Sequence, residues 1–241
     1  MPLCLPGPEP RRREAGSRAG PKPAEPRLEL GRLERLALAA GRLVTAILAP
    51  LLLFQACATP PPPLEADDFC RIFSDKDGWY RGARRSFERW GVPESVQLAV
   101  VNQESRFRAR ARPERRRVLW VIPLGRRSSA YGYGQVKDDT WADYVRATGR
   151  RGAGRDDFAD VADFIGWYGD LIHRRTAVAK HDAYHLYLAY HEGPGGFARG
   201  THQGKAWLLE VARLVEARAR LYQAQYLGCR DRLAASHARR F

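Results

Sequence analysis

The stretch VPESVQLAVVNQESRF, residues 92–107, is typical of a helix that lies in a protein core. Pro93 is favoured in the first turn of a helix, and apolar residues follow it at helical spacing. The side chains expected to point inward are those of Val96, Ala99, Val100 and Val101. Glu104 stands near the end of this apolar helix, where the helix dipole disfavours a carboxylate. The position of this acid therefore needs an explanation.

The chain from Asp67 onward is mostly helical in pattern. Further helices are expected within residues 75–91, 137–149, 155–178 and about 205–227, and the stretch 181–196 is expected to run from a helix into a glycine-rich loop. The last of these is expected to place one apolar stripe inward, made of Trp207, Leu208, Val211, Leu214, Val215, Leu221 and Tyr222. A short strand is predicted from Val118 to Ile122, inside a basic excursion at 110–127. The fold class is therefore mainly α, in a single domain with little β structure.

The first 57 residues do not have the composition of a folded domain, because they are rich in Pro, Gly and Arg. An apolar run at 43–56 is short for a membrane span and contains Pro50, which favours a signal-peptide core. The run ends at Cys57 and is followed by a Pro-rich spacer, which resembles a bacterial lipoprotein signal with Cys57 as the lipidation site. An ordinary cleaved signal or an uncleaved anchor are the alternatives. The expected boundaries are a leader at 1–57, a tether at 58–68, a folded domain at 69–230 and a basic tail at 231–241.

Charge and cysteine content limit the partners and the compartment. The formal net charge of +14 permits nucleic-acid binding, but the arginines are spread along the chain and no zinc spacing or RNA-binding aromatic signature accompanies them. We therefore expect no nucleic-acid partner and favour an anionic surface, such as a bacterial wall or lipid headgroups. Cys70 and Cys229 stand at the two ends of the domain, and an exported pair most simply forms one disulfide. Two free buried thiols are the alternative.

Glu104 has the sequence context of a general acid. Its helical neighbours at i−4 and i−3 are Val100 and Val101, so its carboxyl group lies along an apolar stripe. Desolvation and the helix end both raise the pKa of such a carboxyl group, whereas Arg106 and Arg108 oppose this if they reach it. A carboxyl group that is protonated near neutral pH can protonate a leaving ether oxygen. The alternative is a helix-end glutamate paired with an arginine.

Three short motifs follow one another at suggestive spacing: Glu104-Ser-Arg-Phe107, Gly132-Tyr-Gly-Gln-Val136 and Ala189-Tyr-His-Glu-Gly193. In order and spacing they resemble the landmarks of lytic transglycosylases of the soluble-transglycosylase, goose-lysozyme-like group, and most of all a lipoprotein subgroup. The resemblance covers about residues 70–229. There are two departures, because Gly134 stands where the group has Met and His191 stands where it has Asn.

The resemblance implies a lysozyme-like catalytic domain that cleaves peptidoglycan between N-acetylmuramic acid and N-acetylglucosamine. Glu104 would be the single general acid and base, and a 1,6-anhydro ring would form without water. No cofactor or metal is implied. The residues expected to bind substrate or support the site are Ser105, Tyr133, Gln135, Tyr190 and His191. From the residues alone, Gln135 is also read as a helix-capping group and Tyr190 as a core aromatic.

Two other functions stay open at this point. Asp138 or Asp139 as a second carboxylate would suit a goose-type muramidase that hydrolyses the same bond, although both are ordinary first-turn acids of a helix. A non-catalytic wall-binding lipoprotein is the second alternative. His181 and His185 lack the acid of a zinc-peptidase pattern, so no metal is expected. The protein is expected to be an exported, periplasmic monomer, lipid-anchored to the outer membrane.

Overall fold

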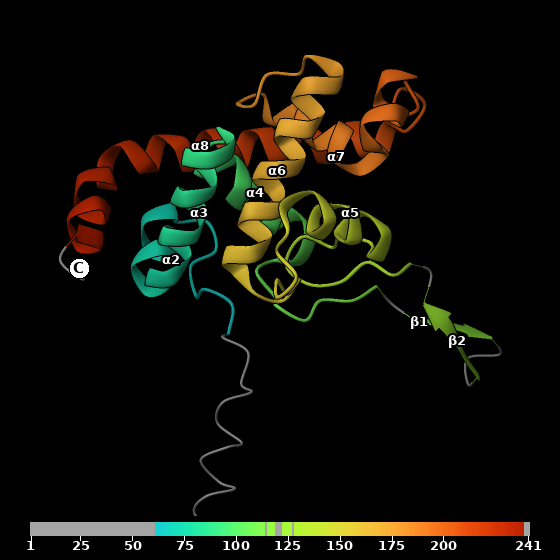
Figure 1. Ribbon diagram of the computed structural model, residues 1–241, viewed down its shortest axis with the longest axis horizontal. Helices are drawn as coiled ribbons and strands as arrows, with labels where there is room; N and C mark the ends of the chain where they lie inside the picture. The colour runs from blue at the N-terminus through green and yellow to red at the C-terminus, as the bar shows by residue number, and fades with distance from the viewer. Residues whose placement is uncertain (1–60, 114, 119–121, 127, 239–241) are drawn as a thin grey trace, which may run out of the picture. The chain divides into compact units, whose positions relative to one another are not determined.

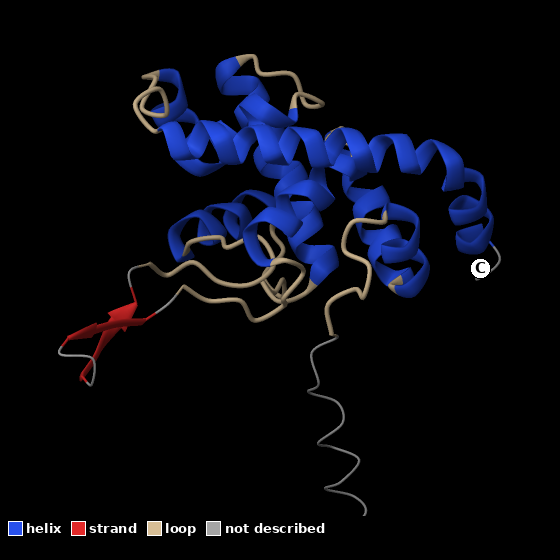
Figure 2. Ribbon diagram, turned by 180° about the vertical axis from the view of Figure 1, so that it is seen from behind, coloured by secondary structure: helices blue, strands red, loops and turns tan. Residues whose placement is uncertain are grey.

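The computed structural model describes residues 61–113, 115–118, 122–126 and 128–238. In this part of the chain seven helices and one hairpin follow one another, and Figure 1 labels them. Their bounds are α2 Phe69–Asp75, α3 Asp77–Trp90, α4 Glu94–Ser105, β1 Arg115–Val118, β2 Ile122–Arg126, α5 Asp138–Thr148, α6 Phe158–Thr176, α7 Ala183–Ala198 and α8 Ala206–Ala238. Figure 2 shows strands only in the hairpin among the described residues. The prediction of a mainly α fold is confirmed.

Helix α4 is the core helix of the domain, in contact with α3, α6 and α8. All four side chains predicted to point inward are at most 2 % exposed. The helix also buries polar side chains, and the amide donors of Gln97 and Asn102 are hydrogen-bonded, as burial favours. The Gln97 amide donates to the carbonyl oxygens of Ala83 and Val92, and the Asn102 amide donates to the Tyr222 hydroxyl. These contacts hold α4 in one position against its neighbours.

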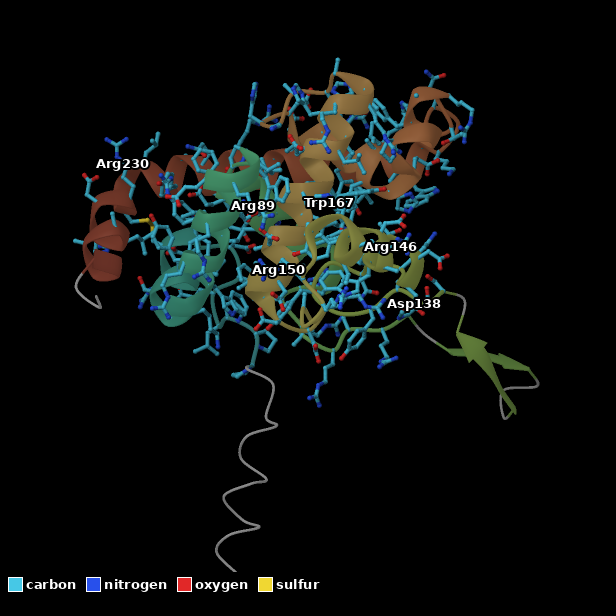
Figure 3. All side chains as sticks on the ribbon, in the orientation of Figure 1. Arg89, Asp138, Arg146, Arg150, Trp167 and Arg230 are labelled. Carbon is cyan, nitrogen blue, oxygen red and sulfur yellow. A yellow bond between two sulfur atoms is a disulfide. The ribbon has the colours of Figure 1, made fainter. Side chains whose placement is uncertain are left out.

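Small residues bring α3 and α6 close together. A Cβ atom at Gly82 would lie 2.7 Å from that of Ala159, so only glycine allows this approach. The ring of Trp79 stacks on Phe158 with centroids 4.1 Å apart. Asp163 of α6 accepts hydrogen bonds from the Trp90 indole and from the Tyr144 hydroxyl, which links α3, α6 and α5. Two arginines labelled in Figure 3, Arg89 and Arg150, also pair with Asp163.

The two ends of the domain are joined. Cys70 of α2 and Cys229 of α8 form a disulfide bond, with Cα atoms 6.1 Å apart. Closing a loop of this length constrains the unfolded chain, which the chain-entropy description values at about 5 kcal/mol. The end of the Pro-rich segment also packs on α8, since the Gln225 amide donates to the Asp67 carbonyl oxygen and Arg218 pairs with Asp67. The folded domain thus includes residues that were expected to belong to the tether.

Several elements differ from the expectation. The predicted strand at 118–122 is replaced by two strands, β1 and β2, which pair antiparallel with Val118 opposite Ile122. Helix α7 does not end in a loop at its glycines, because it kinks at Gly193 and resumes with Pro194 in the favoured first-turn position. Helix α8 continues past 227 to Ala238, so most of the expected tail is helical. Among the described residues, no helix is long and apolar enough to span a membrane.

The apolar stripe predicted for α8 was partly wrong. Leu208, Val215 and Tyr222 are buried as expected, but Trp207, Leu214 and Leu221 are between 46 and 57 % exposed. The buried row is completed by Ala212 and Ala219, whose small side chains let α8 lie close to its neighbours. One face of the first half of α8 therefore carries exposed apolar side chains.

Candidate active site

The three motifs meet at one pocket of about 640 Å³. Glu104 reaches it from the last turn of α4, Gln135 from the loop before α5, and Tyr190 from α7 before its kink. Further aromatic and polar side chains line it, among them Phe164, Tyr168, Lys137, Thr140, His191 and Glu192. The site is thus a polar cleft with aromatic walls, which is the composition of a small-ligand site.

Glu104 is partly exposed and lines this pocket. Burial raises the pKa of its carboxyl group to about 7, although a hydrogen bond from Tyr187 lowers it. Helix α4 ends directly after it, because Arg106 adopts a left-handed conformation with φ 50°. Arg106 is exposed, and the Arg108 guanidinium donates to the Ser105 carbonyl oxygen. Among the side chains that the structure describes, no base forms an ion pair with Glu104.

Tyr187 is a site residue that the sequence analysis missed. Its hydroxyl donates to Oε1 of Glu104 over 2.9 Å, and its side chain is only 4 % exposed. Burial, followed by the Glu104 carboxylate, raises the pKa of this phenol, so it remains a donor. A signal was available, because Tyr187 precedes Tyr190 by three residues and shares its helical face.

Gln135 shapes the glycine loop from within. Its backbone has φ 47°, and its side-chain amide donates to the carbonyl oxygens of Ala111 and Gly132, each over 3.0 Å. Helix α5 begins after Lys137, and the backbone N–H of Asp138 in its first turn donates to the Ser129 hydroxyl rather than to Gln135, so the capping alternative for Gln135 is wrong. Oε1 of Gln135 accepts no hydrogen bond within the described residues and remains available to a ligand.

Tyr190 joins the second motif to the third. Its hydroxyl donates to the Gly134 carbonyl oxygen over 2.8 Å, and burial raises its pKa well above the ordinary value. A Cβ atom at Gly134 would lie 3.0 Å from this hydroxyl and 3.1 Å from Val161. Gly134 therefore leaves just enough room for the phenol to reach the loop.

Two residues expected at the substrate lie in the core instead. The Ser105 side chain is 1 % exposed, and its hydroxyl donates to the Val101 carbonyl oxygen of the preceding turn. Tyr133 is fully buried with its ring edge-on to Trp79 and Phe158. Its hydroxyl has no hydrogen-bond partner within the described residues. The expectation that either side chain binds sugar is corrected, while Ser105 can still support the end of α4.

Glu192 is the second carboxylate that lines the pocket, and the sequence analysis missed it as well. Lys205 donates to both of its oxygens over 2.7 and 2.8 Å, and Thr201 and His191 also contact it. These hydrogen bonds, Lys205 first, lower the pKa of Glu192 to about 2. Glu192 is therefore a fixed anion, whereas Glu104 exchanges a proton near neutral pH.

Asp138 and Asp139 are not at the pocket surface. Both stand in the first turn of α5, and Asp138 pairs with Arg155 over 2.7 Å; Figure 3 labels Asp138 at this helix start. The described residues contain no group of three or more His, Cys, Asp or Glu side chains that could hold a metal ion. Cys57 lies outside the described residues.

A second pocket, of about 930 Å³, is larger than the first. It lies between the start of α4, the start of α7 and α8, and Ser95, Tyr184 and Arg220 are among its lining residues. None of the three motifs contributes to it, and its lining includes charged side chains of both signs, among them Asp182, Arg213 and Glu216. The chemistry therefore points to the smaller pocket.

A comparison with protein families shows to which family the chain belongs. The model of the Transglycosylase SLT domain matches residues 45–229, which span α2 to α7 and most of α8. The chain belongs to this family. Membership in a transglycosylase SLT family implies an enzyme that cleaves peptidoglycan. No curated protein and no solved structure matches the chain.

Proposed function

We propose that this SLT-domain protein is a lytic transglycosylase in which Glu104 alone acts as acid and then as base. The observation that carries the proposal is the contrast between the two carboxylates at the pocket. Burial raises the pKa of Glu104 to about 7, and hydrogen bonds from Lys205 and its neighbours lower that of Glu192 to about 2. Only the first can give up and regain a proton near neutral pH, as acid–base catalysis requires.

The reaction begins with the protonated Glu104 carboxyl group beside the bond between N-acetylmuramic acid and N-acetylglucosamine. Glu104 gives its proton to the glycosidic oxygen, and the bond from this oxygen to the muramic C1 breaks. The N-acetyl oxygen of the same sugar attacks C1, so that the substrate supplies the nucleophile. Tyr187 stabilises the carboxylate that forms, because its hydroxyl already donates to Oε1.

The second step returns the proton. The Glu104 carboxylate takes the proton of the sugar's own 6-hydroxyl, whose oxygen attacks C1 and displaces the N-acetyl oxygen. The products are a 1,6-anhydro sugar end and a free 4-hydroxyl, and Glu104 is again protonated. We expect Oε1 of Gln135 and the side chain of His191 to bind the substrate, because both residues line the pocket, and Tyr190 donates a hydrogen bond to the loop that carries Gln135.

Product analysis tests this function. Purified sacculi are digested with the protein, the released muropeptides are treated with borohydride, and their masses are measured by mass spectrometry. The proposal predicts muropeptides that lack one water and resist reduction. Reducing ends would instead identify a goose-type muramidase, and no release would identify a wall-binding protein.

We also propose that the protein acts outside the cytoplasm, anchored by a lipid on Cys57. Support comes from the apolar run before Cys57, from the disulfide between Cys70 and Cys229 and from the basic composition, which suits an anionic wall. Metabolic labelling with a clickable palmitate analogue tests the anchor. Wild-type protein should carry the label, and a Cys57→Ser variant that still carries it would contradict the proposal.

A further inference from the structure

Trp207 is a large aromatic side chain left in solvent next to the candidate active site. It stands in the first turn of α8 and is 57 % exposed. Single exposed apolar side chains are common on protein surfaces and carry no meaning alone. Trp207 differs because its ring lies 5.2 Å from the ring of His191, nearly perpendicular at 79°, and His191 lines the pocket. The aromatic wall of the pocket thus continues outward onto α8.

Glu192 connects His191 to the segment just before Trp207 through hydrogen bonds. Its side chain is 6 % exposed and accepts hydrogen bonds from Lys205, two residues before Trp207, and from Thr201. It also binds Nδ1 of His191 over 3.0 Å. One buried anion therefore holds both the imidazole and the start of α8. The Glu192 side chain is largely enclosed, whereas Lys205 is 40 % exposed, so the carboxylate is the fixed point of this network.

The position of Glu192 relative to the kink strengthens this reading. Gly193 follows it with φ 74° and ψ 155°, so the helix is interrupted directly after the carboxylate. The interruption turns the chain from the pocket toward the segment that carries Thr201 and Lys205. Glu192 thus joins the two ends of the segment between His191 and Trp207, because it contacts His191 at one end and Lys205 at the other.

We propose that Trp207 and His191 form a sugar subsite at the mouth of the pocket, with Glu192 as the residue that positions both. An indole presents a wide apolar face with few rotatable bonds, and a pyranose ring presents an apolar face of C–H groups that can cover it. The imidazole edge supplies a hydrogen-bonding atom beside that face. The occupant is a sugar of the same glycan strand, beyond the sugars enclosed by the pocket. The subsite rests on the proposed function and adds to it a preference for longer glycan strands.

Binding measured without turnover tests the subsite. In a Glu104→Gln background, tryptophan fluorescence or calorimetry follows the binding of N-acetylglucosamine oligomers of two and of six sugars. Adding Trp207→Ala should weaken the six-sugar ligand about tenfold and the two-sugar ligand less than twofold. Trp207→Phe should restore most of the affinity, because it retains an aromatic face. Glu192→Gln should weaken the six-sugar ligand about as much as Trp207→Ala, since both rings lose their anchor.

Leu214→Ala is the matched control, because Leu214 is 55 % exposed on the same helix, two turns further along. It should bind both oligomers as the parent does. Equal six-sugar affinity for the parent and the Trp207→Ala variant would overturn the subsite and leave the proposed function intact. A loss seen only with ligands that carry stem peptides would overturn the sugar assignment. A parent that binds neither oligomers nor sacculi would contradict the proposed function itself, and the subsite with it.

Discussion

The Tyr187 hydroxyl lies 2.9 Å from Oε1 of Glu104 and donates a hydrogen bond to it, although 83 residues separate the two in sequence. The contact joins α7 to the end of α4 and fixes the carboxyl group at the pocket. It also opposes the effect of burial on the Glu104 pKa, since a donor favours the charged form. Replacing Tyr187 should therefore change both the rate and its pH dependence.

Tyr187→Phe should lower kcat roughly tenfold, because a hydrogen bond to the developing carboxylate is lost. Glu104 must start protonated, so kcat/KM in the wild type should be flat below about pH 7 and fall above it. Without the phenol the Glu104 pKa rises, and the falling limb should move to higher pH. Initial rates on soluble glycan strands between pH 5 and 9 measure both effects. A limb that stays in place, or moves to lower pH, would contradict the assigned role.

The stability of the protein should also depend on Glu104. Because its pKa is higher in the folded state than the ordinary value of 4.5, the folded state binds more protons between about pH 4.5 and 7, and stability falls as pH rises through that window. Glu104→Gln removes this titration and keeps an acceptor for Tyr187. The free energy of unfolding of the variant, relative to that of the wild type, should therefore rise by about 1–3 kcal/mol from pH 5 to pH 8. Urea unfolding at both pH values measures the gain, and a difference independent of pH would argue against a raised pKa.

Gly134→Ala tests the close approach of Tyr190 to the glycine loop. The added Cβ would lie 3.0 Å from the Tyr190 hydroxyl, so the phenol or the loop must shift by a few tenths of an ångström. We expect kcat/KM to fall about tenfold with a stability loss of about 1–2 kcal/mol. Gly78→Ala, on α3 with nothing within 4 Å of the new Cβ, is the control and should keep full activity. Equal behaviour of the two variants would show that the approach has no functional role.

Tyr133→Phe distinguishes a core residue from a substrate-binding one. The hydroxyl is buried without a partner within the described residues, so its removal should leave stability unchanged or raise it by up to about 1 kcal/mol. Activity on sacculi should stay at the wild-type level. A variant that folds normally but loses activity would place Tyr133 at the substrate after all.

The sequence predicted the parts of this site that depend on local pattern. Helical spacing placed Val100 and Val101 in the core and Glu104 near the helix end, because the period of a helix fixes which side chains share a face. The same rule failed for α8, where it selected Trp207 and Leu214 as buried. Two neighbouring stripes had similar hydrophobicity, and the alanines that fit against the other helices decided which one faces inward.

The hydrogen-bond partners of Glu104 and Glu192 could not be predicted from the local sequence pattern. Tyr187 and Lys205 reach these acids only after α7 has packed against the end of α4 and the chain has turned at Gly193. Tyr133 was misplaced for a related reason. Side chains of the motif that contains it point to the core or to the pocket, and only the packing of Tyr133 against Trp79 and Phe158 shows that this side chain lies in the core.

The acid–base role of Glu104 is tested most directly by digesting purified sacculi with the Glu104→Gln variant and counting anhydro muropeptides by mass spectrometry. The variant should release none above background, while its circular dichroism and its sedimentation with sacculi match those of the wild type. Leu214→Ala, on the exposed face of α8, serves as the control that retains turnover. Continued release of anhydro muropeptides by the folded Glu104→Gln variant would contradict the account.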